Sequence, residues 1–202
     1  MKIVCIARNY VDHAKELNNA VPTTPVLFLK PDTALLQGNA FFMPDFSADM
    51  HYETELVIRI GKNGKHIDES FALNYVDAIT TGIDFTARDV QARQKEKGLP
   101  WEIAKAFDQS AVVGSWQDAD PVRNGRPVHF SMHRNGNLVQ QGNSQDMIFS
   151  VARQISYAST FFTLRQGDIL FTGTPSGVGP VAPGDKLEGF LETDKVFDIQ
   201  IR

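Results

Sequence analysis

The stretch HYETELVIRIG, residues 51–61, alternates between apolar and polar residues as a β-strand does. Successive side chains of a strand point to opposite faces, so Leu56, Ile58 and Ile60 share one face. Glu53 and Glu55 point together from neighbouring pleats of the other face. The stretch therefore predicts a strand with one apolar face and two adjacent carboxylates on the opposite face.

Two carboxylates about 4 Å apart repel each other by about 4 kcal/mol at an effective dielectric constant of about 20. An exposed strand face, where water screens both charges, is one explanation for the pair. A divalent cation is the other, because Mg²⁺ binds carboxylate oxygens at about 2.0–2.1 Å. Asp84, near the end of the strand-like run 75–85, suits either a cap for the next segment or a third ligand. Too few cationic residues stand near the three acids in sequence to balance them, which favours a metal.

The composition is that of an ordinary globular protein. The chain has 202 residues, enough for one well-buried core, and we expect a single domain over residues 1–202. A net charge of −4 gives no electrostatic basis for binding nucleic acid or an anionic membrane, and no apolar run approaches the roughly 18 residues that span a bilayer. The apolar run at the N-terminus is too short for a signal peptide, and the single cysteine, Cys5, excludes an intramolecular disulfide. These features predict a cytoplasmic protein.

Strand-like runs dominate the rest of the chain. They cover residues 2–7, 26–29, 75–85 and two short runs within 186–202, and a hairpin turn is predicted at 134–137. A second hairpin signal, Gly-Lys-Asn-Gly, occupies residues 61–64. Helical patterns are fewer, at 10–17, at 86–97 and most clearly at 150–162, where Ser150 is the expected N-cap. Because strands and helices do not alternate regularly, the pattern predicts the α+β class rather than a Rossmann or TIM-barrel fold.

Several polar residues in these segments suit catalysis. His13 and Glu16 stand three residues apart on a predicted helical turn, so they form either a surface pair or a dyad whose carboxylate orients the imidazole. Arg88 and Gln91 share a face in the same way. Lys105 lies among apolar neighbours in WEIAKAF, residues 101–107, where a buried lysine requires an anionic partner.

The segment GDILFTGTPSGVG, residues 167–179, combines a strand with a glycine-rich turn. It is not a phosphate-binding P-loop, because no Gly-Lys-Ser/Thr follows and no helix begins there. Its glycines allow the backbone to approach a neighbouring group closely, and Thr172 and Thr174 supply hydroxyls at that point.

Six motifs, in this order, resemble the fumarylacetoacetate hydrolase family and cover nearly the whole chain. They are ARNYVDHAKE at 7–16, LFLKP at 27–31, HYETEL at 51–56, GIDFTARDVQ at 82–91, KGLPWEIAKAFD at 97–108 and GDILFTGTPSGVG at 167–179. The chain is most similar to the branch that contains acylpyruvate hydrolase and oxaloacetate decarboxylase. The resemblance implies a rolled mixed β-sheet with few helices, a homodimer and a Mg²⁺ or Mn²⁺ cofactor.

The same resemblance implies a role for each polar residue identified above. The metal ligands would be Glu53, Glu55 and Asp84, the catalytic groups His13, Glu16 and Lys105, and the substrate-binding residues Arg88, Gln91 and Thr174.

The implied activity is metal-dependent cleavage of a small 2-oxo acid through a metal-bound enolate. For an acylpyruvate, His13 and Glu16 would activate the water that hydrolyses the C–C bond, whereas oxaloacetate would lose CO₂ without attack by water. One alternative is an isomerase or decarboxylase of hydroxymuconate-type diacids. An alternative of another class is a non-catalytic β-module that binds a metal or ligand, although such a binder has no use for a water-activating dyad.

Overall fold

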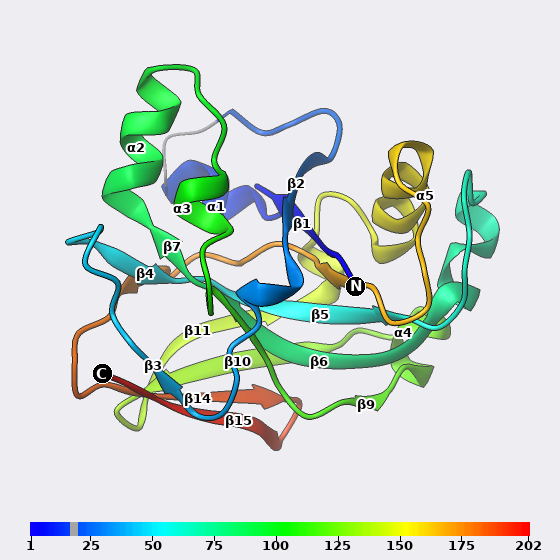
Figure 1. Ribbon diagram of the computed structural model, residues 1–202. Coiled ribbons are helices and arrows are strands. Elements are labelled where there is room, and N and C mark those ends of the chain that lie inside the picture. Colours follow the sequence, from blue (N-terminus) through cyan, green and yellow to red (C-terminus); the bar gives the residue numbers. More distant parts are fainter. Residues whose placement is uncertain (17–19) are drawn as a thin grey trace.

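The structure is a computed structural model that describes residues 1–16 and 20–202 of the chain. Figure 1 shows the two larger β-sheets at the centre of the molecule, with the helices α1, α2, α3 and α5 on one side of them. This is the rolled, strand-rich α+β fold with few helices that the sequence predicts.

The largest sheet is mixed. Its strands lie in the order β2 (Val26–Lys30), β1 (Ile3–Ala7), β12 (Ile169–Phe171), β5 (Thr54–Ile60), β6 (Val76–Asp84) and β8 (Ala111–Val113), and β9 (Gln117–Asp118) also pairs with β6. The pair formed by β1 and β12 is parallel, and the other pairs are antiparallel. Because β12 lies between β1 and β5, motifs from the start, middle and end of the chain meet in one sheet.

The second sheet packs against one face of the first. It consists of β11 (Asn137–Asn143), β10 (His129–Arg134), β14 (Lys186–Leu191), β15 (Asp194–Ile201) and β3 (Ala40–Phe41), in that order. Leu56 and Ile58 of β5 belong to the same buried apolar cluster as Met132 and Leu187 of this sheet. A third, small sheet is formed by β13 (Gly179–Pro180), β4 (Met50–Tyr52) and β7 (Thr86–Ala87).

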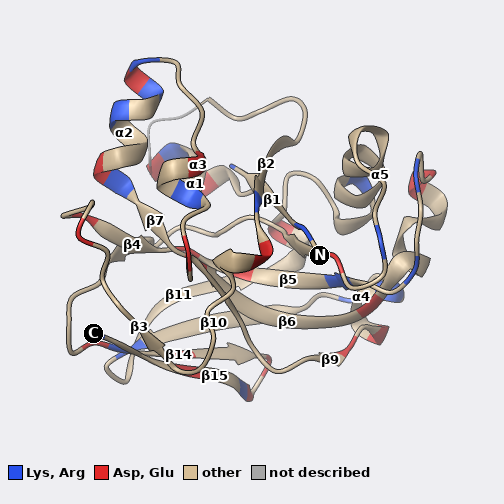
Figure 2. Cartoon of the chain, in the orientation of Figure 1, with Lys and Arg blue, Asp and Glu red and all other residues tan. Residues whose placement is uncertain are grey.

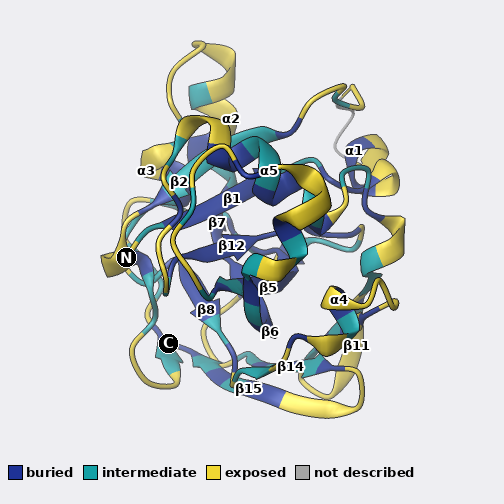
Figure 3. Cartoon of the chain, turned by 90° about the vertical axis from the view of Figure 1, so that its right-hand side faces the viewer, coloured by how far each residue is buried: buried dark blue, intermediate teal, exposed yellow. Residues whose placement is uncertain are grey.

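Short helices occupy the connections. They are α1 (Val11–Glu16), α2 (Arg88–Glu96), α3 (Glu102–Lys105), α4 (Asp120–Arg123) and α5 (Val151–Phe161), with the 3₁₀ helices η1 (Asp32–Ala34), η2 (Glu69–Tyr75) and η3 (Ser144–Asp146). Helix α5 begins as predicted, because the Ser150 hydroxyl accepts a hydrogen bond from the N–H of Arg153. Figure 3 shows exposed residues on the outer side of α5, and Figure 2 shows charges of both signs on α2. None of the helices in the described ranges is long and apolar enough to cross a membrane.

The structure corrects two local predictions, and a third extends beyond the described residues. The stretch 51–61 is two strands rather than one, because His51 belongs to β4 and the ladder of β5 begins only after Glu53. The signal at 61–64 is not a tight hairpin, since Gly64 pairs with Leu164 and η2 follows before β6 begins. The predicted helix 10–17 ends at Glu16 within the described residues, and its last position lies outside them.

Candidate active site

The three predicted metal ligands meet where β5 and β6 pair. The N–H of Asp84 donates to the carbonyl of Glu53 at 2.8 Å, and Glu55 pairs with Gly82 in the same ladder. Each of the three acids offers one carboxylate oxygen, and these oxygens lie within 4.8 Å of one another. Glu53 is 6%, Glu55 2% and Asp84 1% exposed, which excludes the explanation of a solvated strand face.

Cations from other elements of the described chain contact these acids directly. Lys105 Nζ lies 2.7 Å from both Glu53 Oε2 and Asp84 Oδ2. Arg88 Nη2 lies 2.6 Å from Glu53 Oε1, and Lys30 Nζ lies 2.7 Å from Asp84 Oδ1. Few cations stand near the acids in sequence, but this scarcity does not hold in space, because the fold brings these side chains in from other elements.

The charges of the cluster shift its protonation equilibria in opposite directions. Burial by itself would raise the pKa of Glu53, but Lys105 and Arg88 outweigh it and hold that pKa well below the usual range. Burial, followed by the charges of Asp84 and Glu53, raises the pKa of Glu55 well above its usual range. Burial lowers the pKa of Lys105, but the two neighbouring carboxylates more than compensate and raise it. Lys105 is therefore a charged ammonium at the centre of the site.

The acidic cluster fits a hard divalent cation. Ligand oxygens around an octahedral ion at about 2.1 Å lie about 3.0 to 4.2 Å apart, and the three carboxylates offer oxygens within 4.8 Å of one another. Asp84 Oδ1 is buried and, within the described ranges, accepts no hydrogen bond, although it forms the ion pair with Lys30. The Lys105 ammonium occupies the space between Glu53 and Asp84, so a bound metal would have to displace it.

His13 and Glu16 form a pair anchored to the glycine-rich segment. His13 is 4% exposed, and its Nδ1 lies 3.2 Å from Glu16 Oε2. The other carboxylate oxygen of Glu16 accepts a hydrogen bond of 3.0 Å from the N–H of Gly177. The imidazole lines the same pocket as the acids, so the explanation of a surface ion pair is excluded for His13.

The remaining predicted residues also reach this pocket. Arg88 Nη1 donates to Gln91 Oε1 at 2.8 Å, and Arg88 Nε is buried without a hydrogen-bond partner among the residues that the structure describes. The hydroxyl of Thr174 donates to the carbonyl of Thr54 at 2.9 Å and accepts from Gln140. The single hydroxyl proton of Thr174 is therefore already used, and this side chain has less to offer a substrate than Arg88.

Gly173 holds the glycine-rich segment against β5. Its N–H donates to Glu55 Oε2 at 2.6 Å and so orients that carboxylate. Its φ of +99° is in the left-handed region, and a Cβ at this position would lie 2.6 Å from the Cβ of Asn9. Only glycine combines this conformation with this close approach.

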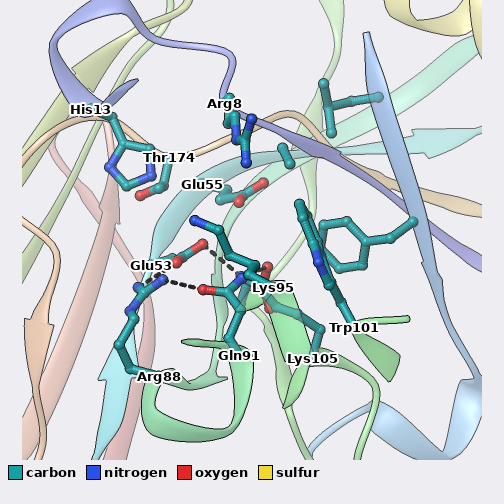
Figure 4. Close-up of a pocket in the computed structure, with 14 residues that line it drawn as sticks. Arg8, His13, Glu53, Glu55, Arg88, Gln91, Lys95, Trp101, Lys105 and Thr174 are labelled. Carbon is teal, nitrogen blue, oxygen red and sulfur yellow. Dashed lines mark hydrogen bonds and ion pairs between the residues drawn. The ribbon is translucent and has the colours of Figure 1, made fainter. Parts of the chain in front are cut away.

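One pocket brings the predicted residues together (Figure 4). Its lining includes His13, Glu53, Glu55, Asp84, Arg88, Gln91, Lys105 and Thr174. Glu16 is not part of the lining but is paired with His13. The open space between the side chains is about 40 Å³. The sequence did not predict a site role for the lining residues Arg8, Phe28, Lys95 and Trp101, or for Lys30 behind Asp84. The one local signal for Lys30 was its place at the end of an apolar strand, within LFLKP.

Comparison with known proteins places the chain among enzymes. A family profile described as "Fumarylacetoacetate (FAA) hydrolase C-terminal" matches residues 2–201. The chain belongs to the fumarylacetoacetate hydrolase family. Among its relatives are the mitochondrial oxaloacetate tautomerase FAHD1 of Mus musculus, 42% identical over 94% of this chain and 86% of the relative, and the mitochondrial oxaloacetate decarboxylase of Dictyostelium discoideum, 43% identical over 100% and 94%.

A solved structure of the same family is closely similar. The fumarylpyruvate hydrolase of Pseudomonas aeruginosa, in complex with Mn²⁺ and pyruvate, has a TM-score of 0.93 and 37% identity, and the match covers 100% of this chain and 89% of that one. These relatives act on oxaloacetate or fumarylpyruvate, as their names state, and one binds Mn²⁺. Two of them are named as mitochondrial, so a cytoplasmic location for this member of the fumarylacetoacetate hydrolase family stays a prediction.

Proposed function

We propose that the protein is a Mg²⁺- or Mn²⁺-dependent enzyme of small 2-oxo acids, which decarboxylates oxaloacetate, hydrolyses acylpyruvates, or does both. The observation that carries the proposal is one pocket that holds three buried carboxylates beside a His13–Glu16 pair and the cationic Arg88. The oxaloacetate enzymes and the Mn²⁺- and pyruvate-bound hydrolase among its relatives support the same substrate class.

Glu53, Glu55 and Asp84 would hold the metal, which when bound supplies Lewis acidity to the carbonyl end of the substrate. Lys105 would then leave its two carboxylates, and its ammonium would become available to an anionic oxygen of the substrate. Arg88 Nε is a buried donor without a hydrogen-bond partner in the described part of the chain, so the guanidinium has capacity for a substrate carboxylate beside Gln91.

His13 is placed to move a proton. With the proton on Nδ1, the ring donates to Glu16, and Nε2 is the acceptor. For an acylpyruvate, His13 removes a proton from water, the water oxygen bonds to the distal carbonyl carbon, and the C–C bond breaks with its electron pair moving into the enolate of pyruvate. The enolate is then protonated at carbon. For oxaloacetate, the bond to the departing CO₂ supplies the electron pair, so attack by water is not required.

Turnover assays test the proposal directly. We expect the purified protein with Mg²⁺ or Mn²⁺ to release pyruvate from oxaloacetate or acetylpyruvate, and thorough chelation to abolish the activity until metal is restored. Full activity after chelation, or no turnover of either compound with either metal, would refute the proposal.

Tautomerisation of oxaloacetate is a second candidate, favoured by the names of several relatives. Conversion of the enol into the ketone requires a group that takes the enol proton and a proton donor at C3, and the buried His13 is suited to such a transfer. Loss of the enol's ultraviolet absorbance without release of pyruvate would distinguish this reaction from decarboxylation. The diacid isomerase considered from the sequence is the same kind of proton transfer, and the same assay with a hydroxymuconate-type diacid tests it.

A further inference from the structure

The pocket has an outer, cationic part that the proposed reaction does not use. Arg8 follows β1, Lys95 lies in the last turn of α2, and Trp101 precedes α3, yet all three side chains line the pocket of the acids. Figure 4 shows Arg8 and Lys95 directed into this space, with Trp101 beside them. Three separate elements therefore supply the outer part of one site.

The backbone of Arg8 is held in an unusual conformation. Its φ is +60°, in the left-handed region that residues with a Cβ seldom adopt. The next residue, Asn9, is fully buried, and its side chain donates to the carbonyl of Thr172 at 2.8 Å and accepts from the N–H of Phe149 at 2.8 Å. Conformations of this kind persist where the surrounding structure enforces them, and they gather at functional sites.

Trp101 supports the guanidinium of Arg8, whose central carbon lies 5.9 Å from the centre of the indole ring. Among the residues that the structure describes, no carboxylate forms an ion pair with Arg8, in contrast to Lys30, Arg88 and Lys105. The Arg8 charge is thus positioned by the fold and not neutralised by it.

Lys95 shares one face of α2 with Arg88 and Gln91, seven and four residues before it. Burial lowers the pKa of Lys95, and the charges of Arg8 and Arg88 lower it further. Lys95 lines the same pocket as Arg8 and Arg88 and is close enough for both charges to repel it, and an anion placed between Arg8 and Lys95 would relieve part of that repulsion.

We propose that Arg8 and Lys95 form a subsite for the distal carboxylate of a dicarboxylic 2-oxo acid, and this inference rests on the proposed function of the same pocket. A substrate whose 2-oxo acid end lies at the three acids directs its other end toward the outer cations. A second carboxylate there accepts charge-assisted hydrogen bonds from both side chains, whereas a terminal methyl group can accept none.

The test compares ligands of equal length that differ only at the far end. Oxaloacetate is paired with 2-oxobutyrate, and 2-oxoglutarate with 2-oxopentanoate. Thermal-shift titrations of the Mn²⁺-loaded protein give Kd for the three acids that are not turned over, and oxaloacetate, which the proposed activity consumes, is compared through its KM. We expect the dicarboxylate of at least one pair to bind about 10- to 100-fold more tightly, the range of a charge-assisted hydrogen bond. Arg8→Met and Lys95→Met should each remove most of that difference and leave Kd for the monocarboxylic partner within about threefold.

Lys97→Met is the matched control, since Lys97 is exposed at the end of the same helix and does not line the pocket. Equal binding of both members at both lengths in the natural protein would refute the subsite while leaving the proposed function intact. Failure of all four acids to bind would refute the proposed function and the subsite together. A preference that survives in both variants would show that the distal carboxylate binds elsewhere.

Discussion

The Lys105 ammonium bridges two carboxylates of the acidic cluster when no metal is bound. Removing this charge should therefore make the stability of the fold depend on a bound metal. Lys105→Met keeps the length of the side chain and deletes the ammonium that bridges Glu53 and Asp84. Removing one partner of a buried ion pair costs about 3–5 kcal/mol. Glu53 keeps Arg88 and Asp84 keeps Lys30, so we expect the lower end of that range, about 3 kcal/mol.

Metal should stabilise the variant more than the natural protein. In the natural protein the ion must displace an ammonium from two carboxylates, whereas Lys105→Met leaves those carboxylates open. A ligand at 100 times its Kd stabilises the folded state by about 2.7 kcal/mol, enough to offset most of the loss. The free energy of unfolding is therefore measured in urea, once with a chelator and once with saturating Mg²⁺, for both proteins.

The control is Lys186→Met, which removes partly exposed ion pairs to Glu188 and Asp198 at the surface. Surface pairs of this kind contribute little, and Mg²⁺ should not change their effect. Two results would each show that the Lys105 ammonium does not take the place of the metal between Glu53 and Asp84. One is a Lys105→Met variant that is as stable as the natural protein in chelator, and the other is an equal rise in the free energy of unfolding of both proteins with Mg²⁺.

Four other outcomes follow from the structure. Glu53→Gln should weaken Mg²⁺ binding in calorimetry, and unchanged affinity would exclude this ligand. Glu16→Gln should slow acetylpyruvate hydrolysis about 10²- to 10⁴-fold more than oxaloacetate decarboxylation, because only hydrolysis needs His13 to activate water, and equal losses in kcat would contradict that role. Asp168 accepts hydrogen bonds from the N–H and Nζ of Lys2, which outweigh burial and lower its pKa, so its contribution is present above its ordinary pKa of 3.8 and lost as pH falls through the lowered value. Asp168→Asn should therefore cost about 1.5–3 kcal/mol at pH 7, with a difference that shrinks below about pH 4 in urea unfolding. A homodimer is predicted by family resemblance, and a stable monomer in light scattering would contradict it.

Local sequence patterns predicted the elements that interactions between residues near in sequence determine. The Ser150 cap and the apolar face of residues 150–162 define α5, and the Asn-Gly turn at 135–136 joins β10 to β11. The break in the stretch 51–61 has a non-local cause. Met50 and His51 pair with the small third sheet, whereas Thr54 begins the ladder to β6, and neither partner can be inferred from the stretch itself.

The same distinction separates what was found at the site from what was missed. The acids were identifiable because alternation places Glu53 and Glu55 on one face, and Asp84 stands near the end of a second strand-like run, where it suited either a cap or a third ligand. Their counter-ions were not, because Lys30 and Lys105 come from other elements and meet the acids only through tertiary packing. Repulsion between carboxylates indicated that cations must be present, but it could not distinguish a metal from an ammonium.

The balance of charge in the site gives an order to its binding events. Without a metal, the carboxylates of Glu53 and Asp84 face the cations Lys30, Arg88 and Lys105, and the raised pKa of Glu55 favours its neutral form, so the cluster carries no excess of negative charge. A divalent cation adds positive charge to a site that excludes most water, and such an excess is costly unless an anion enters as well. A 2-oxo acid with two carboxylates would bring two negative charges, one to the inner cluster and one toward Arg8 and the outer cations. Metal binding thus leaves the site with excess positive charge, which an anionic substrate then neutralises. A dicarboxylic acid neutralises it more fully than a monocarboxylic acid.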